Sequence, residues 1–345
     1  MDIAPEIKNL LPEEIAGRLN MLGLPRYRAD QIIGWIYDKG VTDFDSMTNL
    51  SKALRAQIKE IFTHRILVPK KVWISTDGTR KYLFELPDGA CIESVLIPEE
   101  RRRTLCVSSQ VGCALACSFC FTGTMGFTRN LETWEIIEQA LAVRRERPIE
   151  EWPTNVVLMG MGEPLLNYEN VIRAARLMAR DIGLKFSHRR ITLSTVGIPM
   201  MLDRLAHDDA PVSLAISINA PDDQTRSRIM PVNRSYPLDE VIEALERFPL
   251  TNRKKITFEY VMLAGINDSP LHARKLANKI KRFPCKVNLI YFNPYPGSEF
   301  KASPREAVEE FQKILREMKH LTTIIRKSRG QDIMAACGQL AGDKS

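Results

Sequence analysis

Three cysteines in one short segment are the residues in this chain best suited to metal chemistry. Cys113, Cys117 and Cys120 are spaced C-x-x-x-C-x-x-C, and Phe119 precedes the last of them. Thiolates are soft ligands that suit zinc or an iron–sulfur cluster. Structural zinc sites and ordinary ferredoxin clusters take four protein ligands. Three thiolates would leave one iron of a four-iron cluster without a protein ligand, and that iron could bind a substrate or cofactor.

Two simpler interpretations of the cysteines remain open at this point. Cys106 could be a fourth zinc ligand, although its separation from Cys113 is wider than in the usual zinc knuckle. Disulfides would need an oxidising compartment, and seven cysteines in 345 residues are too few for a disulfide scaffold. The clustered spacing therefore favours metal or redox use in a reducing compartment.

The overall composition is typical of a soluble globular protein. Hydrophobic residues make up 44% and charged residues 26% of the sequence. A chain of 345 residues is long enough for one large domain and an appendage. The N-terminus lacks the basic-then-apolar layout of a signal peptide, and no apolar run is long enough to cross a membrane. We therefore expect a cytoplasmic protein without membrane association, and we expect it to be a monomer.

The chain is basic, with a net charge of +7. A positive charge favours a polyanionic partner such as RNA, although a single bunch of basic residues is more often just a solvated face. Several bunches near the ends of predicted elements would suit a surface that contacts phosphates. These bunches are Arg101–Arg103, Arg144–Arg147, His188–Arg190, Arg253–Lys255 and Arg326–Arg329.

The predicted elements divide the chain into four parts. Residues 1–65 carry three short amphipathic helical patterns and form an N-terminal helical accessory domain. Residues 66–100 contain three strand patterns separated by Asp-Gly turns, which predict an antiparallel β-meander linker. Residues 101–327 alternate strand and helix, and residues 328–345 are a C-terminal tail that carries Cys337.

The alternating part predicts an α/β fold with a parallel sheet. Six strand–helix units favour a partial (β/α)6 barrel, although a flat doubly wound sheet has the same periodicity. In both arrangements sites gather at the carboxyl ends of the strands, and the three-cysteine loop follows the first strand. The expected strands are 104–109, 155–159, 190–194, 212–218, 256–263 and 287–292.

Polar residues follow several of these strands. Gly162 would let the backbone approach a ligand closely, and Glu163 would suit an ammonium group. Serine and asparagine at strand ends can hydrogen-bond a ribose or a base, or they can simply cap a turn. The candidates of this kind are Ser194, the stretch Ser217-Ile218-Asn219, and Asn293.

Isolated cysteines and one glutamate complete the set of candidates. A lone cysteine is usually a small buried hydrophobe, and this reading suits Cys91 and Cys285. Cys337 lies instead in a polar, glycine-flanked tail, which could carry a thiol into an active site for a covalent step. Cys106 lies in the first strand of the alternating part. Glu93, on the third strand of the meander, would by default be a solvated side chain.

Taken together, these motifs resemble the RlmN family of radical S-adenosylmethionine (SAM) enzymes. The family methylates carbon 2 of an adenine in 23S ribosomal RNA, at the peptidyl transferase centre, and in transfer RNA, at adenine 37 beside the anticodon. The tail motif separates it from other radical SAM enzymes. The resemblance covers essentially the whole chain and rests on Cys106-Val-Ser-Ser-Gln-Val-Gly-Cys113, the three-cysteine motif, Met161-Gly-Glu-Pro-Leu-Leu-Asn167 and Ala335-Ala-Cys-Gly-Gln-Leu340.

The resemblance implies a role for each candidate residue. Cys113, Cys117 and Cys120 would hold a 4Fe-4S cluster whose remaining iron is chelated by SAM. The SAM contacts would be Gly162, Glu163, Ser194, Ser217, Ile218, Asn219 and Asn293. Cys337 would carry the methyl group, Cys106 would resolve the adduct, and Glu93 would accept a proton. One departure is visible, because the family usually has Ser-Leu-His-Ala where this chain has Ser217-Ile-Asn-Ala.

The implied chemistry explains why these residue types are needed. Carbon 2 of adenine bears an unactivated hydrogen, so direct transfer from SAM fails, whereas a thiolate such as that of Cys337 accepts a methyl group readily. A second SAM, cleaved to a deoxyadenosyl radical by an electron from the cluster, would activate that methyl for addition to adenine. Proton removal and attack by Cys106 would release the product and leave a Cys106–Cys337 disulfide. An external donor, flavodoxin or ferredoxin, would supply the electrons.

Three alternatives stay open on the sequence alone. Methylation of carbon 8 of the same adenine, as in the Cfr group, uses the same cluster and the same two cysteines. An iron–sulfur protein that binds RNA or transfers electrons without methyl transfer would need neither SAM nor Cys337. A zinc-stabilised RNA-binding protein would contain no iron.

Overall fold

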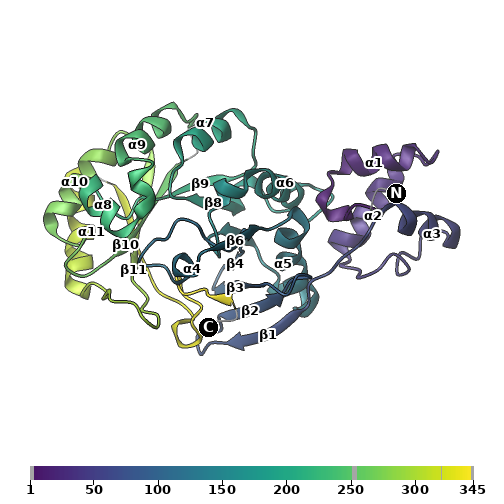
Figure 1. Cartoon of the computed structure of the whole chain (residues 1–345), viewed down its shortest axis with the longest axis horizontal. Coiled ribbons are helices and arrows are strands. Elements are labelled where there is room, and N and C mark those ends of the chain that lie inside the picture. The colour runs from purple at the N-terminus through teal and green to yellow at the C-terminus, as the bar shows by residue number, and fades with distance from the viewer. Residues whose placement is uncertain (1–3, 251–254, 320, 343–345) are drawn as a thin grey trace.

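The computed structural model describes residues 4–250, 255–319 and 321–342. Within these ranges the strands form one large sheet, whose strand order follows the sequence from edge to edge, and a small hairpin of β5 and β6 (Figure 1). The strands are β1 (Pro69–Ile74), β2 (Arg80–Glu85), β3 (Cys91–Glu99), β4 (Arg102–Cys106), β5 (Gln110–Gly112), β6 (Phe127–Asn130), β7 (Asn155–Leu158), β8 (Ile191–Thr195), β9 (Ser213–Ser217), β10 (Ile256–Met262), β11 (Cys285–Tyr291) and β12 (Thr322–Arg326).

The predicted meander forms one edge of the large sheet. β1, β2 and β3 pair antiparallel, and Gly78 and Gly89 occupy the turns with φ near +82°. That left-handed conformation is the one that the Asp-Gly turns favour. β3 then pairs antiparallel with β4, so the meander continues directly into the sheet of the alternating part.

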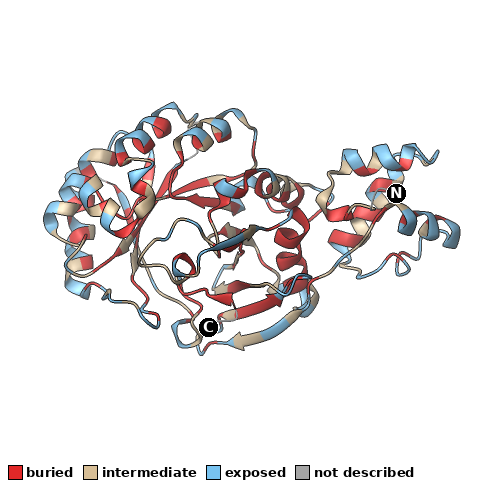
Figure 2. Cartoon of the chain, in the orientation of Figure 1, coloured by how far each residue is buried: buried red, intermediate tan, exposed pale blue. Residues whose placement is uncertain are grey.

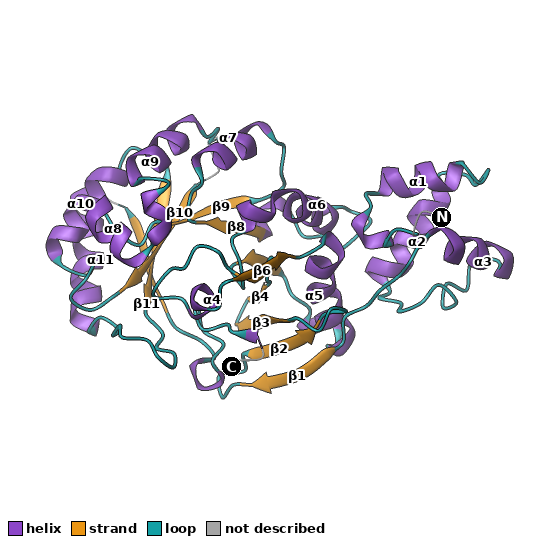
Figure 3. Ribbon diagram, viewed as in Figure 1, coloured by secondary structure: helices purple, strands orange, loops and turns teal. Residues whose placement is uncertain are grey.

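From β4 to β12 every neighbouring pair of strands is parallel. A doubly wound sheet would reverse its strand order at a switch point, whereas this order is sequential. The strands curve around an interior, and the long helices lie outside them, as in a partial barrel (Figure 3). The helices of this part are α4 (Phe121–Thr124), α5 (Thr133–Glu146), α6 (Tyr168–Ala179), α7 (Pro199–His207), α8 (Asp223–Ile229), α9 (Leu238–Arg247), α10 (Pro270–Ile280) and α11 (Arg305–Lys319).

The barrel has one parallel strand more than the six predicted. β12 follows α11 after a very short connection and pairs with β11. Its residues alternate between exposed and buried or half-buried positions, as expected for the edge of a sheet. Such a short, mixed segment lacks the continuous apolar run by which buried parallel strands are recognised.

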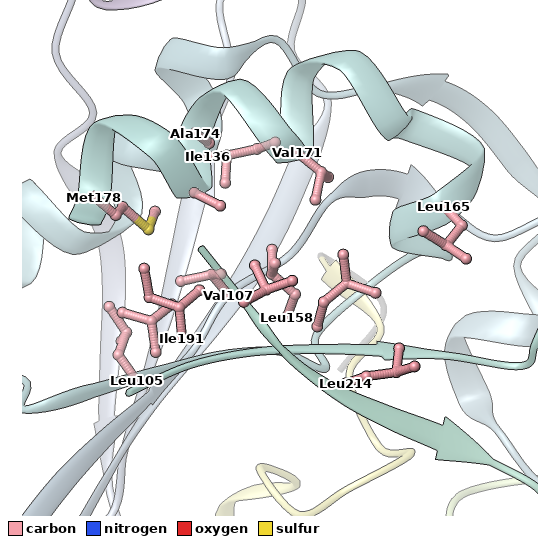
Figure 4. Close-up of a cluster of buried hydrophobic side chains, with 14 of the residues drawn as sticks. Leu105, Val107, Ile136, Leu158, Leu165, Val171, Ala174, Met178, Ile191 and Leu214 are labelled. Carbon is pink, nitrogen blue, oxygen red and sulfur yellow. The ribbon is translucent and has the colours of Figure 1, made fainter. Parts of the chain in front are cut away.

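The core lies between the strands and the outer helices. Side chains of β4, β7, β8 and β9 meet those of α5 and α6 (Figure 4). α5 is buried on almost every side, from Thr133 to Val143, because the barrel covers one face and the N-terminal helices cover another (Figure 2). The labelled core residues are Leu105, Val107, Ile136, Leu158, Leu165, Val171, Ala174, Met178, Ile191 and Leu214.

The N-terminal part contains the three expected helices. Ser51 caps the third, since its hydroxyl accepts a hydrogen bond from the Leu54 N–H at 3.2 Å. The first ends at Asn20, and Leu22, which follows it, is 43% exposed. The elements are η1 (Ile7–Asn9), α1 (Pro12–Asn20), α2 (Tyr27–Ile33), the π-helical turn η2 (Gly34–Asp38) and α3 (Lys52–Ile61).

Buried ion pairs join these helices to the barrel. Lys8 lies 3.0 Å from a carboxylate oxygen of Glu6 and 3.5 Å from one of Glu138 on α5, and all three side chains are buried. Arg145 reaches the second oxygen of Glu138 at 2.6 Å. Each of these charges therefore has an oppositely charged partner within the fold, as a buried ion pair requires.

Short 3-10 turns complete the described chain. They are η3 (Ile149–Glu151), η4 (Pro164–Asn167), η5 (His188–Arg190), η6 (Pro231–Arg234) and η7 (Gln331–Ile333). Arg253 and Lys254 of one predicted basic bunch lie outside the described residues. Of the helices in the described part of the chain, none combines the length and apolar character needed to cross a bilayer.

Candidate active site

A pocket opens inside the barrel at the carboxyl ends of the parallel strands. The three clustered cysteines, the segments that follow β7, β8 and β9, and the C-terminal tail all contribute to its wall. Figure 1 shows the tail beside the cysteine loop and α4, although more than 200 residues separate them in sequence. Of the predicted site residues, the pocket is lined by Cys113, Cys117, Cys120, Gly162, Glu163, Ser194, Ser217, Asn219 and Cys337.

The cysteine loop is held at both ends and at its centre. β5 and β6 bracket it, and the N–H of Cys113 donates to the carbonyl of Gly126 at 2.8 Å. Gly112 has a φ of +74°, and a Cβ there would lie 2.0 Å from that same carbonyl oxygen, so only glycine fits. At the centre, the hydroxyl of Tyr295 donates to the carbonyl of Ser118 at 2.8 Å.

The three thiols suit a cluster better than a single ion. All are free cysteines that face the same pocket. Yet in the part of the chain that the structure describes, no three His, Cys, Asp or Glu side chains gather closely enough to hold one metal ion. A four-iron cluster takes one thiolate per iron, so its ligands need only surround a common space. Burial raises the pKa of Cys113 to about 12, and a bound metal would supply the positive charge that a thiolate needs.

Glu163 is a buried carboxylate at the end of the second barrel strand. It accepts hydrogen bonds from the N–H groups of Leu165 at 3.1 Å and Val196 at 3.0 Å. Burial raises its pKa to about 7, despite these donors and a hydrogen bond with Thr195. An ammonium group in the pocket would favour the ionised form. Gly162 before it has no room for a side chain, because a Cβ would lie 2.5 Å from that of Gln110.

The ends of β8 and β9 lie side by side in the pocket wall. The hydroxyls of Ser194 and Ser217 are 3.4 Å apart. Asn219 has a left-handed φ of +52°, a conformation that asparagine tolerates better than most residues. Its side-chain oxygen accepts from the Val261 N–H at 2.9 Å, and its amide nitrogen contacts the sulfur of Met230 at 3.4 Å. These contacts fix the orientation of the Asn219 side chain.

Ile218 and Asn293 differ from the other predicted SAM contacts. The Ile218 side chain belongs to the buried core, and its N–H and carbonyl are both used within the fold. The Asn293 side chain is occupied by the tail, because it donates to the Cys337 carbonyl at 3.2 Å and accepts from Gln331 at 2.8 Å. The structure therefore places Asn293 against the segment that carries Cys337.

The tail is fastened to the cysteine loop by a series of hydrogen bonds. The N–H of Phe121 donates to the Gly338 carbonyl at 2.7 Å, and the Thr122 hydroxyl donates to the Leu340 carbonyl at 2.6 Å. Cys337 is exposed when the whole residue is considered, but its side chain lines the pocket. Burial of the thiol there raises its pKa to about 12. The nearby Cys120 thiol adds to that rise.

Cys106 lies at the end of β4, close enough to Cys337 for the two thiols to interact electrostatically. Burial raises the pKa of Cys106 to about 12, and the neighbouring Cys337 thiol contributes to the increase. The two cysteines are 231 positions apart in sequence, so only the docked tail brings them together. Both are free thiols in this structure.

Glu93 is fully buried, unlike the solvated glutamate that its strand position would usually predict. One carboxylate oxygen lies 3.0 Å from the ammonium group of Lys81, which is itself only 1% exposed. The other oxygen accepts from the Ala341 N–H at 2.8 Å. Glu93 thus contacts the same tail that carries Cys337.

Two residues that bear on the site, Glu259 in the pocket and Lys81 beside Glu93, were not among the predicted residues. Glu259, in the middle of β10, faces the pocket and accepts a hydrogen bond from Asn288 at 2.8 Å, and burial raises its pKa. A glutamate inside an apolar strand was a signal that the sequence did contain. Lys81 gave no comparable signal, because only the pairing of β2 with β3 brings it beside Glu93.

The partial barrel, the three-cysteine loop and the buried carboxylate at the next strand end define a radical SAM enzyme. A family model described as the Radical SAM superfamily matches residues 107–277, and one described as the ribosomal RNA large subunit methyltransferase N-terminal domain matches residues 6–63. A crystal structure of a radical SAM methyltransferase from Sphaerobacter thermophilus superposes with a TM-score of 0.92 at 44% identity, covering 98% of this chain and 99% of that one.

Curated relatives narrow the class. The dual-specificity RNA methyltransferase RlmN of Geobacter sulfurreducens is 51% identical over 342 residues, covering 99% of this chain and 93% of the relative. That of Pelobacter propionicus is 49% identical over 337 residues, covering 98% and 96%. The chain belongs to the RlmN family. As a radical SAM enzyme it uses a 4Fe-4S cluster and SAM, and the pocket residues fit both.

Proposed function

We propose that this protein methylates carbon 2 of adenine in 23S ribosomal RNA and in transfer RNA. Its relatives are named dual-specificity RNA methyltransferases, and residues 6–63 match a ribosomal RNA large subunit methyltransferase domain. One observation carries the proposal. Cys337 lines the same pocket as Cys113, Cys117 and Cys120, and its thiol is close enough to that of Cys106 for the two to interact electrostatically. This arrangement matches the needs of a covalent methyl carrier and a resolving thiol, which must approach each other beside the cluster.

The residues of the cluster and SAM sites follow from their positions. Cys113, Cys117 and Cys120 hold the cluster. Gly162, Glu163, Ser194, Ser217 and Asn219 line the SAM-binding strand ends, with Glu163 facing the ammonium group. Ile218 holds Ser217 and Asn219 in place from the core. When bound, SAM and the cluster would supply a transferable methyl group and a hydrogen-abstracting radical.

Cys337 is the residue that accepts the methyl group, and the tail contacts hold it in place. Asn293 anchors the Cys337 carbonyl, and the loop residue Phe121 anchors the next one. Asn293 therefore acts through the position of the tail, in addition to any contact with SAM. Cys106 is the thiol that attacks the Cys337 sulfur and releases the product as a disulfide forms.

Glu93 is the proton acceptor. Its carboxylate can take up the carbon-2 proton, and the ammonium group of Lys81 lies 3.0 Å from one of its oxygens and holds the side chain in place. The hydrogen bond from the Ala341 N–H holds Glu93 against the tail, and therefore close to the adduct that the tail would carry. A carboxylate in such a dry, fixed position suits general base catalysis.

The RNA would approach the carboxyl edge of the barrel. Of the basic bunches, Arg326–Arg329 alone follows a barrel strand, β12, and precedes the tail. Arg101–Arg103 and His188–Arg190 begin or precede β4 and β8 and lie at the opposite edge. Within Arg144–Arg147, Arg144 donates to the Leu184 carbonyl at 2.6 Å and Arg145 pairs with Glu138, so these two are structural. Flavodoxin or ferredoxin as electron donor, a monomeric state and a cytoplasmic location stay predictions.

Nucleoside analysis tests the proposal. Anaerobically reconstituted protein is incubated with SAM, a reductant and unmodified 23S or transfer RNA, and the digested RNA is examined by mass spectrometry. We expect 2-methyladenosine from the wild type and none from Cys337→Ala. Cys285→Ala, a change at a buried cysteine away from the pocket, is the matched control and should retain activity. 8-Methyladenosine, or product from Cys337→Ala, would contradict the proposal.

Cys106→Ala separates the two thiols. The methyl transfer and the addition to adenine need Cys337 but not Cys106, so this variant should accumulate a covalent protein–RNA adduct. The adduct is visible as a retarded protein band that RNase treatment shifts. Free turnover by Cys106→Ala would remove Cys106 from the mechanism.

A further inference from the structure

Arg226 is a buried arginine in α8 that neither the motifs nor the proposed reaction uses. Its side chain is 0% exposed. The guanidinium donates to the carbonyls of Ile218 at 3.2 Å, Val196 at 2.6 Å and Tyr236 at 3.3 Å, and to the side-chain oxygen of Asn233 at 2.7 Å. These partners satisfy its donors, but all of them are neutral.

A buried charge without an opposite charge beside it is strongly unfavourable. Among the described residues, no carboxylate is a hydrogen-bond partner of Arg226. The carboxylate of Asp223 is reached only through Asn233, which donates to it at 2.8 Å. Burial lowers the pKa of Arg226 to about 10, so the guanidinium still carries its charge near neutral pH.

The contacts of Arg226 and its helix lead to the cluster and to SAM. Val196 and Ile218 belong to the strand-end segments that also carry Ser194 and Asn219, so one guanidinium ties the two segments together.

The same helix also contacts the cysteine loop. Ile229, the last residue of α8, accepts hydrogen bonds from both the N–H of Ser118 at 3.0 Å and its hydroxyl at 3.1 Å. Ser118 follows Cys117 directly, so α8 lies against the loop that would hold the cluster. The negative charge of the cluster and its thiolates would attract the guanidinium of Arg226.

We propose that Arg226 is a positioning residue that supplies the buried counter-charge of the 4Fe-4S cluster and fixes the two strand ends that contact SAM. A positive charge stabilises the reduced, more negative cluster and so raises its reduction potential. The planar fork of arginine lets one side chain hold several carbonyls in a fixed geometry. The proposal rests on the radical SAM assignment and is independent of which RNA atom is methylated.

Two substitutions separate the charge from the fork. Arg226→Gln removes the charge, and Arg226→Lys keeps it but loses the fork. In anaerobically reconstituted protein, EPR-monitored redox titration should show a lower midpoint potential of the cluster in Arg226→Gln than in the wild type. A tenfold change in the one-electron equilibrium constant corresponds to about 59 mV. Arg226→Lys should keep the wild-type potential. Both variants should bind SAM at least about fivefold more weakly, because the strand ends are no longer tied. A fully iron-loaded Arg226→Gln with the wild-type potential would overturn the proposal.

A third variant keeps the test decisive if Arg226→Gln does not fold or load iron. The same oxygen of Asp223 accepts hydrogen bonds from Asn233 at 2.8 Å and Leu238 at 2.7 Å, and Asp223→Asn can retain both. Loss of this charge leaves Arg226 less compensated, so the midpoint potential should rise. Asp239→Asn, on an exposed side chain of α9, is the matched control and should leave it unchanged. Equal potentials in Asp223→Asn and the control would overturn the proposal, whereas the RNA product of the wild type tests the proposed function separately.

Discussion

The interface between the N-terminal helices and α5 buries its charges in pairs, whereas Glu163 and Arg226 near the barrel pocket are buried without an ion-pair partner among the described residues. At the interface, Lys8 lies between Glu6 and Glu138, and Arg145 pairs with Glu138. In the pocket region, Glu163 is buried with only N–H and hydroxyl donors, and Arg226 is buried with only neutral acceptors. Unpaired buried charges are unfavourable. The two regions therefore differ in whether the folded protein itself supplies an opposite charge for each buried charge.

The difference distinguishes charges that stabilise the fold from charges that would bind a ligand. At the interface, Lys8 and Arg145 compensate the carboxylates of Glu6 and Glu138 within the protein. In the pocket, the ammonium group of SAM would complete Glu163, and the cluster with its thiolates would complete Arg226. Glu163 and Arg226 are thus buried groups with shifted pKa values whose opposite charges the two ligands would supply.

The largest effect should come from the pocket. Cys113→Ala removes one of three iron ligands, so we expect loss of the cluster together with loss of RNA methylation. Iron content, the visible absorption of the cluster and nucleoside analysis measure both losses. Cys285→Ala should keep all three signals, and a Cys113→Ala protein that retained its iron would refute the ligand assignment.

At the interface, the same reasoning predicts a loss of stability instead of a loss of function. Lys8→Met leaves Glu6 and one side of Glu138 without their shared cation, so the free energy of unfolding should fall by about 3–5 kcal/mol. Lys59→Met breaks an exposed pair with Asp45 and should cost less than about 1 kcal/mol. Urea denaturation measures both values. Equal losses would mean that burial of the Lys8 pairs is not what stabilises the interface.

Glu163 should make SAM binding depend on pH. Its folded-state pKa of about 7 lies above the usual 4.5, so protonation is favoured in the protein without SAM. SAM needs the ionised carboxylate, and binding below pH 7 must therefore release a proton. Affinity should fall by up to about tenfold for each unit of pH below 7 and level off above it. Glu163→Gln should bind more weakly with a flat profile between pH 6 and 8. An unchanged slope in Glu163→Gln would assign the dependence to another group.

The smallest effect should come from the surface around the pocket. Lys327 is exposed after β12 on the carboxyl edge, whereas Arg189 is exposed before β8 on the opposite edge. If Lys327 contacts one phosphate, Lys327→Glu should weaken RNA binding and lower the slope of log affinity against log salt by roughly 0.7–0.9. Arg189→Glu is the matched control and should leave the slope unchanged. A larger change in Arg189→Glu would place the RNA on the other edge.

The sequence predicted the parts of the molecule that depend on local spacing. The three-cysteine loop, the alternation of strands and helices and the three N-terminal helices follow from short-range patterns. The structure confirms the partial barrel, which the sequence favoured over a flat doubly wound sheet of the same periodicity. The strand-end rule also predicted that Glu163, Ser194 and Ser217 would lie together, because parallel strands end at a common edge.

What the sequence did not predict depends on contacts between distant segments. Lys81 meets Glu93 only through strand pairing, and Arg226 is buried only because several loops fold over α8. Asn293 was expected to contact SAM, but the place of its side chain is set by the docked tail. β12 was missed because an exposed edge strand lacks a continuous apolar run.

EPR spectroscopy of the reduced, anaerobically reconstituted protein tests the central claim most directly. Three protein thiolates leave one iron open to SAM, so adding SAM should change the cluster spectrum of the wild type. A sample that holds zinc, or a cluster whose spectrum is the same with and without SAM, would contradict the account.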